Sequence, residues 1–534
     1  MTLQSAIDTA RGLMTSGRDL PWLLRHWAER TPDKPFLVWE PFTGSRRVWS
    51  YGELARNVEA FAGALHAHGV RFGERVMLHL DNCPEFAIAW FACARLGAVA
   101  VSTNTRSVAR DMAYFADHAG VVAAVTQPRF ASLVAEAAPA LRALILTDDD
   151  AGEAASVPVT VSHERFADLL AAGHAAPRRA ADPMADLGIQ YTSGTTSRPK
   201  AVLWTHANAL WGAQMNALHM RLREDDVTLT FLPLFHTNAQ SYSMLGSMWV
   251  GATMVVQPRF SASRFWEVSL RNRCTWCSLI PFCVKALLEV PKPREPHHYR
   301  FWGSAISMPE ASAHFGTAIF GWWGMTETIT QGIVGDPVYP GPRLCIGRPS
   351  PGYDIAIRRD DGSPAQPGER GALFIRGVRG VSLFKEYFNN PKANAESFDS
   401  DGWFDTGDLI RIDEAGNLYF GDRHKDMLKV GGENVAASEI EAVLMETGWV
   451  RECAVVAQRH YMLDEVPAAF VLPAAGPPAD LPQRLLDACR AKLADFKVPR
   501  YIELVDDMPR STLEKIAKNA LRERLPAITR DAGE

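Results

Sequence analysis

A run of small polar residues in "YTSGTTSRPK", residues 191–200, is the first candidate for chemistry in this sequence. Every residue from Thr192 to Ser197 is Thr, Ser or Gly, and Lys200 follows closely. The run has no apolar face to bury, but it offers backbone N–H groups, hydroxyl donors and conformational freedom at Gly194. These groups suit an anion, with phosphate as the leading candidate. The alternative is a flexible surface loop, which stretches of this composition usually form.

The run is not a phosphate loop of the Walker type, which requires G-x-x-x-x-G-K-[ST]. Counting from Gly194, Pro199 occupies the second glycine position, and Ala201 replaces the Ser or Thr after Lys200. The preceding "LGIQY" has the composition of a strand. A phosphate-binding turn that follows a strand therefore stays a hypothesis.

The composition of the chain limits its class. A length of 534 residues predicts several domains. Apolar residues make up 47% and charged residues 22%, as is usual for a globular protein in water. The net charge of −5 and the lack of a polybasic block argue against nucleic acid as a partner. The most apolar stretch, "FAIAWFACARLGAVAV", is broken by Arg95 and Gly97, so it predicts a buried helix and a strand rather than a membrane span.

The eight cysteines mostly lie in apolar surroundings. The N-terminus, "MTLQSAIDTARGLM", has no long apolar core and does not resemble a secretory signal. We therefore expect reduced thiols and a cytoplasmic protein. "CTWC" at 274–277 has zinc or redox spacing but no second pair, so core thiols are the preferred interpretation.

The order of elements predicts an α/β protein. "SYGELARNVEAFAGALHAHG" begins with Ser50 and Glu53 in capping-box spacing, and a strand, a helix and another strand follow it. Such alternation predicts parallel sheets flanked by helices in a large N-terminal domain, residues 1–424. Two hairpin patterns indicate a β-rich subdomain at about 340–424. Residues 425–534, which include the capped helix "SEIEAVLMET", form a predicted small α+β domain.

Four further stretches give the first one a context: "GWWGMTET" at 321–328, "WFDTGDL" at 403–409, "GDRHKDMLKVGGENV" at 421–435 and "PRSTLEKIAKNALRE" at 509–523. The five together, in this order and approximate spacing, resemble the adenylate-forming superfamily of acyl-CoA synthetases, carrier-loading adenylation domains and luciferases. The resemblance runs from "WSYGEL" to "LEKIAK", and it is strongest to a bacterial AMP-forming acyl-CoA synthetase.

The resemblance implies an ATP-dependent acid–CoA ligase. The carboxylate of an acid attacks the α-phosphate of ATP, pyrophosphate leaves, and the thiol of CoA then displaces AMP from the acyl-adenylate. Two anions approach in the first step, so positive charge and aligned donors are needed. The implied nucleotide-binding residues are Thr192, Ser193, Gly194, Thr195, Thr196, Lys200, Trp323, Gly324, Asp408 and Arg423.

Trp323, Glu327 and Asp408 each have a structural alternative to the implied role. Trp323 would stack on adenine where the family usually has Tyr, or it is a core tryptophan. Thr326 would contact the α-phosphate. Glu327 would hold Mg²⁺, or it is a solvated surface acid. Asp408 would accept from the ribose hydroxyls, or it stabilises a turn.

The acyl group has its own implied residues. His236 in "LPLFHTNA" would act in catalysis or form the wall of the acyl pocket, although a lone His is more often structural. Gly303, Ser304 and Ala305 in "FWGSAISMP" would lie along the acyl group. A bulky apolar or aromatic acyl group is indicated by four aromatic residues, Trp302, Trp322, Phe235 and Phe282.

The C-terminal domain would be mobile. Lys515 would stabilise the adenylation transition state, with Lys518 as the alternative, because Glu514 replaces the family's usual glycine. The domain would rotate about a hinge at Lys425, since hinges absorb large backbone changes at a few residues. Gly431 and Gly432 would then line the tunnel for CoA.

Two other functions stay open: a free-standing enzyme that loads a carrier-protein thiol, and a catalytically silent protein that binds acyl groups or nucleotides. The silent alternative rests on departures from the family pattern at Ser197, Ala201 and Glu514. The expected partners are a carboxylic acid, ATP with Mg²⁺, and CoA. We carry a homodimer as a hypothesis for the oligomeric state.

Overall fold

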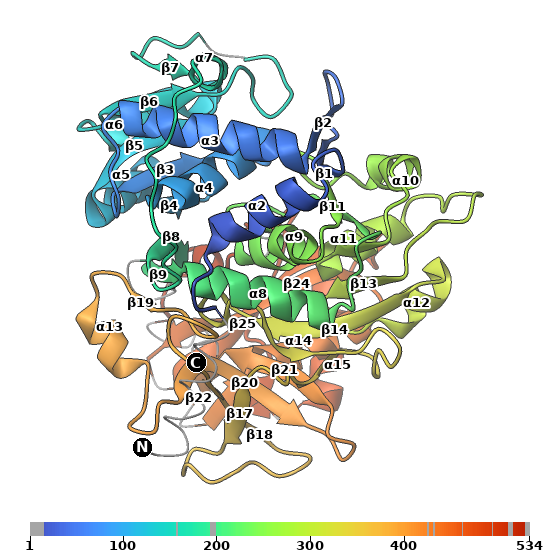
Figure 1. Cartoon of the computed structure of the whole chain (residues 1–534). Coiled ribbons are helices and arrows are strands. Elements are labelled where there is room, and N and C mark those ends of the chain that lie inside the picture. Colours follow the sequence, from blue (N-terminus) through green and yellow to red (C-terminus); the bar gives the residue numbers. More distant parts are fainter. Residues whose placement is uncertain are drawn as a thin grey trace. The chain divides into compact units, whose positions relative to one another are not determined.

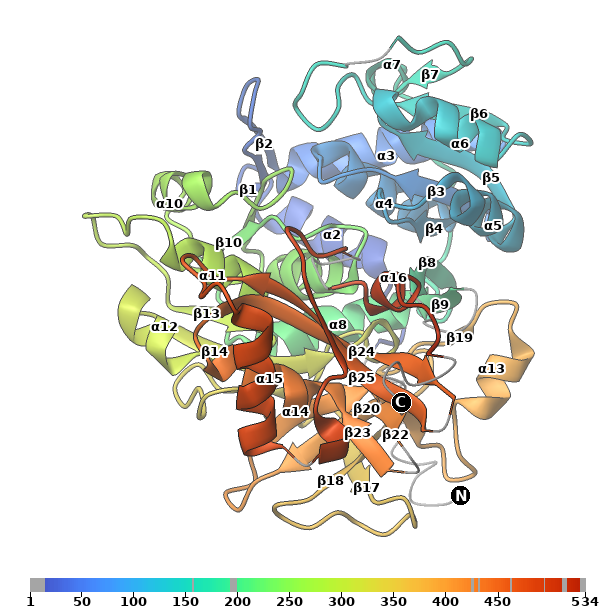
Figure 2. The ribbon, with the colours of Figure 1, turned by 180° about the vertical axis from the view of Figure 1, so that it is seen from behind.

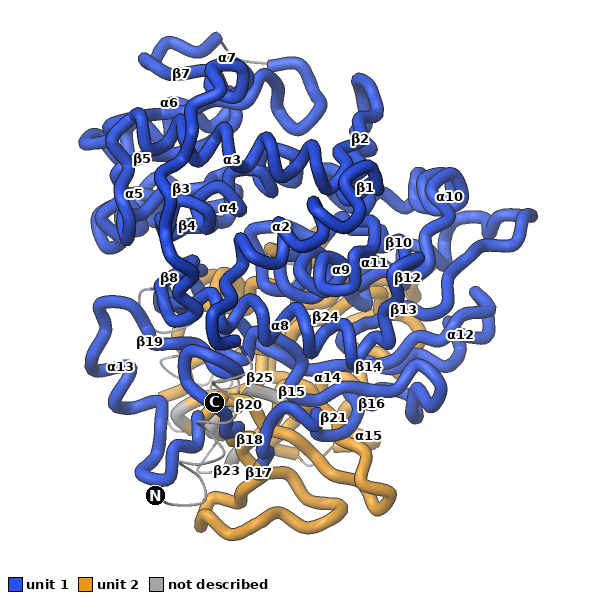
Figure 3. The backbone as a smooth tube through the Cα atoms, viewed as in Figure 1, with its two compact units in different colours: residues 1–355, 375–404 blue, residues 356–374, 405–534 orange. Residues whose placement is uncertain are grey.

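The computed structural model describes residues 15–155, 158–192, 199–423, 427–430, 433–461, 463–493, 495–510 and 516–528. The chain forms two compact units (Figure 3): unit 1, residues 1–355 and 375–404, and unit 2, residues 356–374 and 405–534. The predicted α/β class is confirmed. The predicted hinge at Lys425 lies outside the described residues, so a division of the chain at this position stays a prediction.

The first sheet of unit 1 carries the strand before the phosphate-loop candidate. Its strands are parallel from β8 to β7, whereas β9 runs antiparallel to β8 and β19 antiparallel to β9. In order across the sheet they are β19 (Glu386–Tyr387), β9 (Lys200–Thr205), β8 (Asp186–Thr192), β4 (Val99–Ser102), β3 (Arg75–His79), β5 (Val121–Thr126), β6 (Ala143–Leu146) and β7 (Glu164–Arg165).

Helices cover both faces of this sheet (Figures 1 and 2). One face packs against α5 (Ala109–Ala119) and α6 (Ala131–Ala137). The other packs against α4 (Pro84–Leu96), which in turn contacts α3 (Tyr51–Ala67). The capping box of Ser50 and Glu53 is confirmed at the start of α3, and Gly97 ends α4 in the left-handed conformation with φ +81°. Here the local sequence signals were sufficient.

The second sheet of unit 1 supplies most of the remaining candidate residues. It is parallel from β1 to β14, with antiparallel additions at β2, β15 and β16. In order its unit 1 strands are β16 (Cys345–Pro349), β15 (Gln331–Val334), β14 (Ala318–Gly324), β13 (Phe301–Ser304), β12 (Trp276–Ser278), β10 (Val227–Thr230), β11 (Thr253–Val256), β1 (Pro35–Trp39) and β2 (Arg47–Ser50).

The other helical segments of unit 1 include one that is unusual. The π-helix η2 (Asn238–Leu245) follows His236, and such segments occur frequently at functional sites. The remaining helices are α2 (Leu20–Arg30), η1 (Pro128–Phe130), α7 (Phe166–Ala171), α8 (His206–His219), α9 (Gly246–Trp249), α10 (Ala262–Arg271), α11 (Pro281–Leu288), α12 (Pro309–Phe315), η3 (Thr326–Thr328) and α13 (Pro391–Glu396).

Unit 2 combines the predicted β-rich region with the C-terminal elements. The strands β17 (Asp354–Arg358), β18 (Arg370–Arg376), β20 (Phe404–Ile412) and β21 (Leu418–Arg423) are neighbours in this order. A second sheet contains β23 (Glu433–Ala436), β22 (Met427–Val430), β25 (Asp464–Pro473), β24 (Val450–His460) and β26 (Tyr501–Leu504). Figure 2 shows α14 (Ala437–Glu446) and α15 (Leu481–Lys492) against this sheet, whose other face packs on Leu521 of α16 (Lys518–Arg522).

One detail of the predicted caps is wrong. The helix in "SEIEAVLMET" has Ala436 at its N-cap and no side-chain cap. Ser438 lies inside the helix, and its hydroxyl donates to the carbonyl of Gly421 at 2.9 Å. A long-range hydrogen bond thus uses the residue that looked like a local cap.

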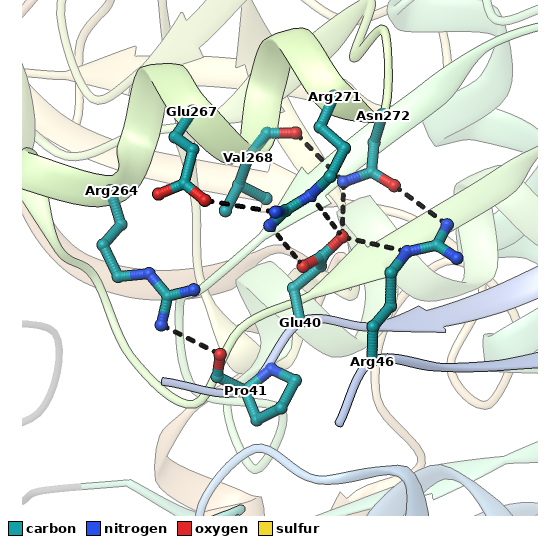
Figure 4. A network of polar contacts seen from close by, with 8 residues as sticks. All are labelled: Glu40, Pro41, Arg46, Arg264, Glu267, Val268, Arg271 and Asn272. Carbon is teal, nitrogen blue, oxygen red and sulfur yellow. Dashed lines mark hydrogen bonds and ion pairs between the residues drawn. The ribbon is translucent and has the colours of Figure 1, made fainter. Parts of the chain in front are cut away.

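The prediction of core thiols in "CTWC" can be compared with the structure. Cys274 and Cys277 are buried, as expected for core thiols. Within the described ranges, no three or more His, Cys, Asp or Glu side chains are grouped closely enough to hold a metal ion, and no helix is long and apolar enough to cross a bilayer. A separate polar cluster around Glu40 joins the end of β1 to α10 (Figure 4).

Candidate active site

The motif "GWWGMTET" leaves the second sheet at the end of β14 and turns sharply. Thr326–Thr328 form one 3₁₀ turn, and Ile329 follows with φ +64°. The N–H of Thr330 donates to the carbonyl of Thr328 at 2.5 Å, which closes a γ-turn around Ile329. A β-branched residue in this region is strained by about 1–3 kcal/mol. The surrounding contacts must therefore hold the turn that carries Thr326 and Glu327.

Three side chains or backbone groups from distant segments hold this turn. The indole N–H of Trp204 donates to the carbonyl of Thr326 at 2.9 Å. The N–H of Phe384 donates to the carbonyl of Glu327 at 2.9 Å, and the phenol of Tyr353 donates to the carbonyl of Thr328. Each carbonyl of the turn thus has a donor from another part of unit 1.

Glu327 is buried, with 3% of its surface exposed, so it is not the solvated surface acid of the alternative interpretation. The phenol of Tyr387 donates to its Oε1 at 2.9 Å. Tyr387 lies on β19, opposite Val202 of β9. The ammonium of Lys200, at the start of β9, lies 4.5 Å from the centre of the Tyr387 ring. Tyr387 therefore connects the lysine after the phosphate-loop candidate with the candidate metal ligand.

Sequence reasoning missed Tyr387. Its stretch "KEYFNNP" has no periodic pattern, and the contacts depend on the pairing of β19 with β9, about 185 residues earlier in the chain. The available signal was a short possible strand before Pro391, which marks the start of a helix. This signal does not predict which strand pairs with it.

Trp323 and Gly324 lie at the end of β14. Trp323 is 6% exposed, and its ring lies against Gly332, where an added Cβ would be 3.0 Å from it. At Gly324, an added Cβ would come within 2.4 Å of the Tyr242 hydroxyl and 2.8 Å of the Thr330 carbonyl. A side chain at residue 324 is therefore excluded by close backbone approach. The predicted stacking of Trp323 on adenine stays a prediction.

A buried polar chain supports the residues after the γ-turn. The hydroxyl of Thr330 lies 2.6 Å from Asn216 Oδ1 and 2.7 Å from Gln331 Oε1. His219 Nδ1 lies 3.0 Å from the same Gln331 oxygen, and His219 Nε2 lies 2.8 Å from the hydroxyl of Ser350. Burial lowers the pKa of His219, which favours the neutral ring. Nδ1 then donates to Gln331 and Nε2 accepts from Ser350, since an amide oxygen can only accept.

His236 lies between two buried amides that fix its loop. Asn82 donates to the carbonyls of Leu232 and Gln257 at 3.0 and 3.1 Å, and its oxygen accepts from the N–H of Leu234 at 2.7 Å. After His236, Gln240 of η2 accepts from the amide of Gln190 on β8 at 2.7 Å. The loop is thus connected to the strand that ends at Thr192.

The acyl-binding candidates lie at the end of β13. Gly303 and Ser304 are buried, and Ala305 is exposed. An added Cβ at Gly303 would lie 1.6 Å from the Trp322 ring, so this indole occupies the space above Gly303. Trp302 is fully buried and packs among aromatic core residues, including Phe265, Trp266 and Phe315.

The ribose candidates lie in unit 2. Asp408 on β20 is buried and stands opposite Arg423 on β21 in the antiparallel register. Their pairing places both residues at one position of this ribbon.

Lys518, the alternative to Lys515 as the catalytic lysine, forms an ion pair with Glu441 at 2.8 Å.

Several predicted residues lie outside the described residues, and nothing in the structure bears on them: Ser193, Gly194, Thr195, Thr196, Lys425, Gly431, Gly432 and Lys515.

Known proteins resemble the chain along most of its length. The model of the AMP-binding enzyme family matches residues 24–388, and that of the AMP-binding enzyme C-terminal domain matches residues 439–515. A crotonobetaine/carnitine–CoA ligase of Escherichia coli O139:H28 is 35% identical over 505 residues, covering 92% of this chain and 96% of that ligase.

Two solved structures also match. An o-succinylbenzoate CoA synthetase from Bacillus subtilis, in complex with its acyl-adenylate intermediate, is 29% identical with a TM-score of 0.79, covering 94% of this chain and 97% of that one. A benzoate CoA ligase from Burkholderia xenovorans LB400 is 27% identical with a TM-score of 0.82, covering 94% and 99%. With its buried Glu327 turn and matches to both family models, the chain belongs to the AMP-binding enzyme family and is an adenylate-forming CoA ligase.

Proposed function

We propose that this chain activates a carboxylic acid with Mg²⁺ and ATP and transfers the acyl group to CoA. The carboxylate attacks the α-phosphate of ATP, which gives an acyl-adenylate and pyrophosphate. The CoA thiolate then attacks the acyl carbon and AMP leaves. The observation that carries the proposal is the connection of Glu327, Tyr387 and Lys200, which places a carboxylate at the hydroxyl and an ammonium over the ring of one tyrosine.

The residues present fit Mg²⁺ and a polyphosphate. A carboxylate oxygen is a ligand that Mg²⁺ accepts, and Glu327 accepts a hydrogen bond from Tyr387 at Oε1. Mg²⁺, when bound, neutralises charge on the phosphates. Lys200 would bind phosphate oxygens, and Thr326 would contact the α-phosphate. Asp408 and Arg423 would bind the ribose.

Residues of the C-terminal part have proposed roles in both half-reactions. Lys515 would stabilise the first transition state, and a rotation about Lys425 would bring Gly431 and Gly432 to the thiol. These residues have the motif positions of the family, and their sequence is the support for the roles.

The test is an assay of the purified chain with ATP, MgCl₂ and a panel of acids. The panel includes crotonobetaine, carnitine, benzoate and o-succinylbenzoate, which the names of the matched ligases supply. We expect pyrophosphate release that needs both ATP and one acid, trapping of the adenylate by hydroxylamine, and a thioester with free CoA. Pyrophosphate release without a thioester would favour a carrier-protein acceptor. No release with any acid would favour the silent binding protein.

A further inference from the structure

We propose that Tyr387 is a positioning residue of the adenylation site: its hydroxyl orients the Glu327 carboxylate toward Mg²⁺, and its ring holds the Lys200 ammonium. The inference rests on the proposed function and adds to it a residue without a predicted role. Its basis is that one side chain contacts both charged candidates, at 2.9 Å and 4.5 Å.

The backbone of Tyr387 is fixed on both sides. Its N–H donates to Asn394 Oδ1 at 2.7 Å, and its carbonyl accepts from Asn394 Nδ2 at 2.9 Å. Asn394 lies on α13, and β19 is paired with β9 at Glu386 and Tyr387. One amide thus clamps both backbone groups of the tyrosine. A residue held in this way can define the position of the groups it contacts.

The side chain is equally constrained. Tyr387 is buried, and its ring centre lies 4.7 Å from that of Phe384. The N–H of Phe384 donates to the carbonyl of Glu327. The segment 384–387 therefore binds Glu327 at two points, the backbone carbonyl of Glu327 and its carboxylate. The carboxylate cannot rotate freely without losing the phenol.

A phenol suits this task because it is a neutral donor. A guanidinium would orient the carboxylate and also neutralise it, whereas a phenol fixes the plane and leaves the negative charge for a cation. Partners that orient metal ligands typically change metal affinity by 10- to 100-fold when they are removed. The ring face attracts the ammonium of Lys200 independently of the hydroxyl. The two contributions can therefore be separated by mutation.

The chain offers a matched control in Tyr353. Both phenols are buried and both donate to the turn Thr326–Thr328, but that of Tyr353 donates to a backbone carbonyl. Tyr353→Phe and Tyr387→Phe each remove one hydroxyl from the support of the turn. Only Tyr387→Phe removes a donor from the carboxylate. Tyr387→Leu removes the ring as well.

The experiment is calorimetric titration of the full chain with ATP, once with saturating MgCl₂, once with EDTA, and across a MgCl₂ series. For Tyr387→Phe we expect the Mg²⁺ concentration at half-saturation to rise about tenfold, with ATP affinity in EDTA unchanged. For Tyr353→Phe, which loses a donor to the backbone of the turn and none to the carboxylate, we expect a clearly smaller shift of the Mg²⁺ dependence than for Tyr387→Phe. For Tyr387→Leu we expect the same rise as for Tyr387→Phe and, in addition, a loss of ATP affinity in EDTA of about threefold, because the ring that attracts Lys200 is gone.

The inference would be overturned by an equal loss of ATP affinity with and without Mg²⁺ in Tyr387→Phe, or by the same shift of Mg²⁺ dependence in Tyr353→Phe. If Tyr387→Phe does not fold, a second variant, Glu327→Gln, provides a test. Glu327→Gln should raise the Mg²⁺ concentration at half-saturation at least as much as Tyr387→Phe is expected to, and a Mg²⁺ dependence equal to that of the wild type would also contradict the inference. The titration of the wild type distinguishes this inference from the proposed function. If the wild type does not bind MgATP, the proposed function itself is refuted.

Discussion

Glu40 and Glu327 are both buried carboxylates of unit 1, with 2% and 3% of their surfaces exposed, and they have different partners. Glu40 accepts from Arg46 at 3.1 Å, from Arg271 at 2.6 Å and from Asn272 at 2.8 Å (Figure 4). The hydrogen bond that Glu327 accepts from Tyr387 comes from a neutral phenol. The partners of Glu40 compensate the charge of its carboxylate and also orient it. The phenol of Tyr387 orients the Glu327 carboxylate.

The partners of each carboxylate indicate its role. A buried carboxylate held by arginines is compensated within the protein, and it joins the segments that supply its partners. Arg271 and Asn272 come from the end of α10, and Glu40 follows β1, so this network ties together segments 231 residues apart. The phenol of Tyr387 orients the Glu327 carboxylate without adding a charge, and Glu327 has the motif position at which the family resemblance implies a ligand for Mg²⁺. We infer a structural role for Glu40 and a role in binding for Glu327.

The largest expected effect is on Glu327. Glu327→Gln keeps the size of the side chain and an acceptor for Tyr387 but removes the negative charge. We expect pyrophosphate release in the presence of the accepted acid to fall by at least 100-fold, because the amide is a poor ligand for Mg²⁺. Urea unfolding should show a change in unfolding free energy below about 1 kcal/mol. If Glu327→Gln instead lost much stability and kept full activity, the role of Glu327 would be structural and not one in binding.

Glu40→Gln should do the opposite. It leaves Arg46 and Arg271 without their shared carboxylate, and loss of one partner of a buried pair costs about 3–5 kcal/mol. The side chains of both arginines are roughly half exposed, so hydration places our expectation near 3 kcal/mol, measured by urea unfolding. Affinity for MgATP should stay within about twofold at a temperature where the variant is folded. A tenfold loss of that affinity would show that the cluster also serves the site.

The sequence predicts the parts of this comparison that depend on local spacing. Ser50 and Glu53 specify a cap within one turn, and "GWWGMTET" identifies Glu327 because a family motif is contiguous. The partners could not be predicted, since Tyr387 meets Glu327 through the pairing of β19 with β9, and Arg271 meets Glu40 through packing of α10. The strained γ-turn at Ile329 has no signal either, because its contacts come from distant segments.

His79 is a third kind of buried ionisable group, one that stays neutral at pH 7. Burial, with a smaller effect of Arg129, lowers its pKa to about 4. The unfolded chain binds this proton near the ordinary value of 6.5, so stability is fully present above that pH and is lost as the pH falls toward 4. From pH 7 to 5 we expect His79 to account for about 2 kcal/mol of lost unfolding free energy.

His79→Gln should reduce this pH slope, measured by urea unfolding at several pH values. Part of the slope should remain, because burial also lowers the pKa of His206, to about 3, and that of His219. An unchanged slope would mean that His79 takes up its proton in the native state as readily as in the unfolded one.

The smallest expected effect separates the two arginines of the Glu40 cluster. Arg46 donates from Nε at 3.1 Å, whereas Arg271 approaches to 2.6 Å and also binds Glu267. Arg46→Ala leaves Glu40 with Arg271 and Asn272, so we expect a loss of about 1 kcal/mol in urea unfolding, and a smaller loss at 1 M salt. Arg271→Ala should cost more under the same conditions. If the two variants lose equal stability, compensation of Glu40 depends on net charge near the carboxylate rather than on the geometry of each donor.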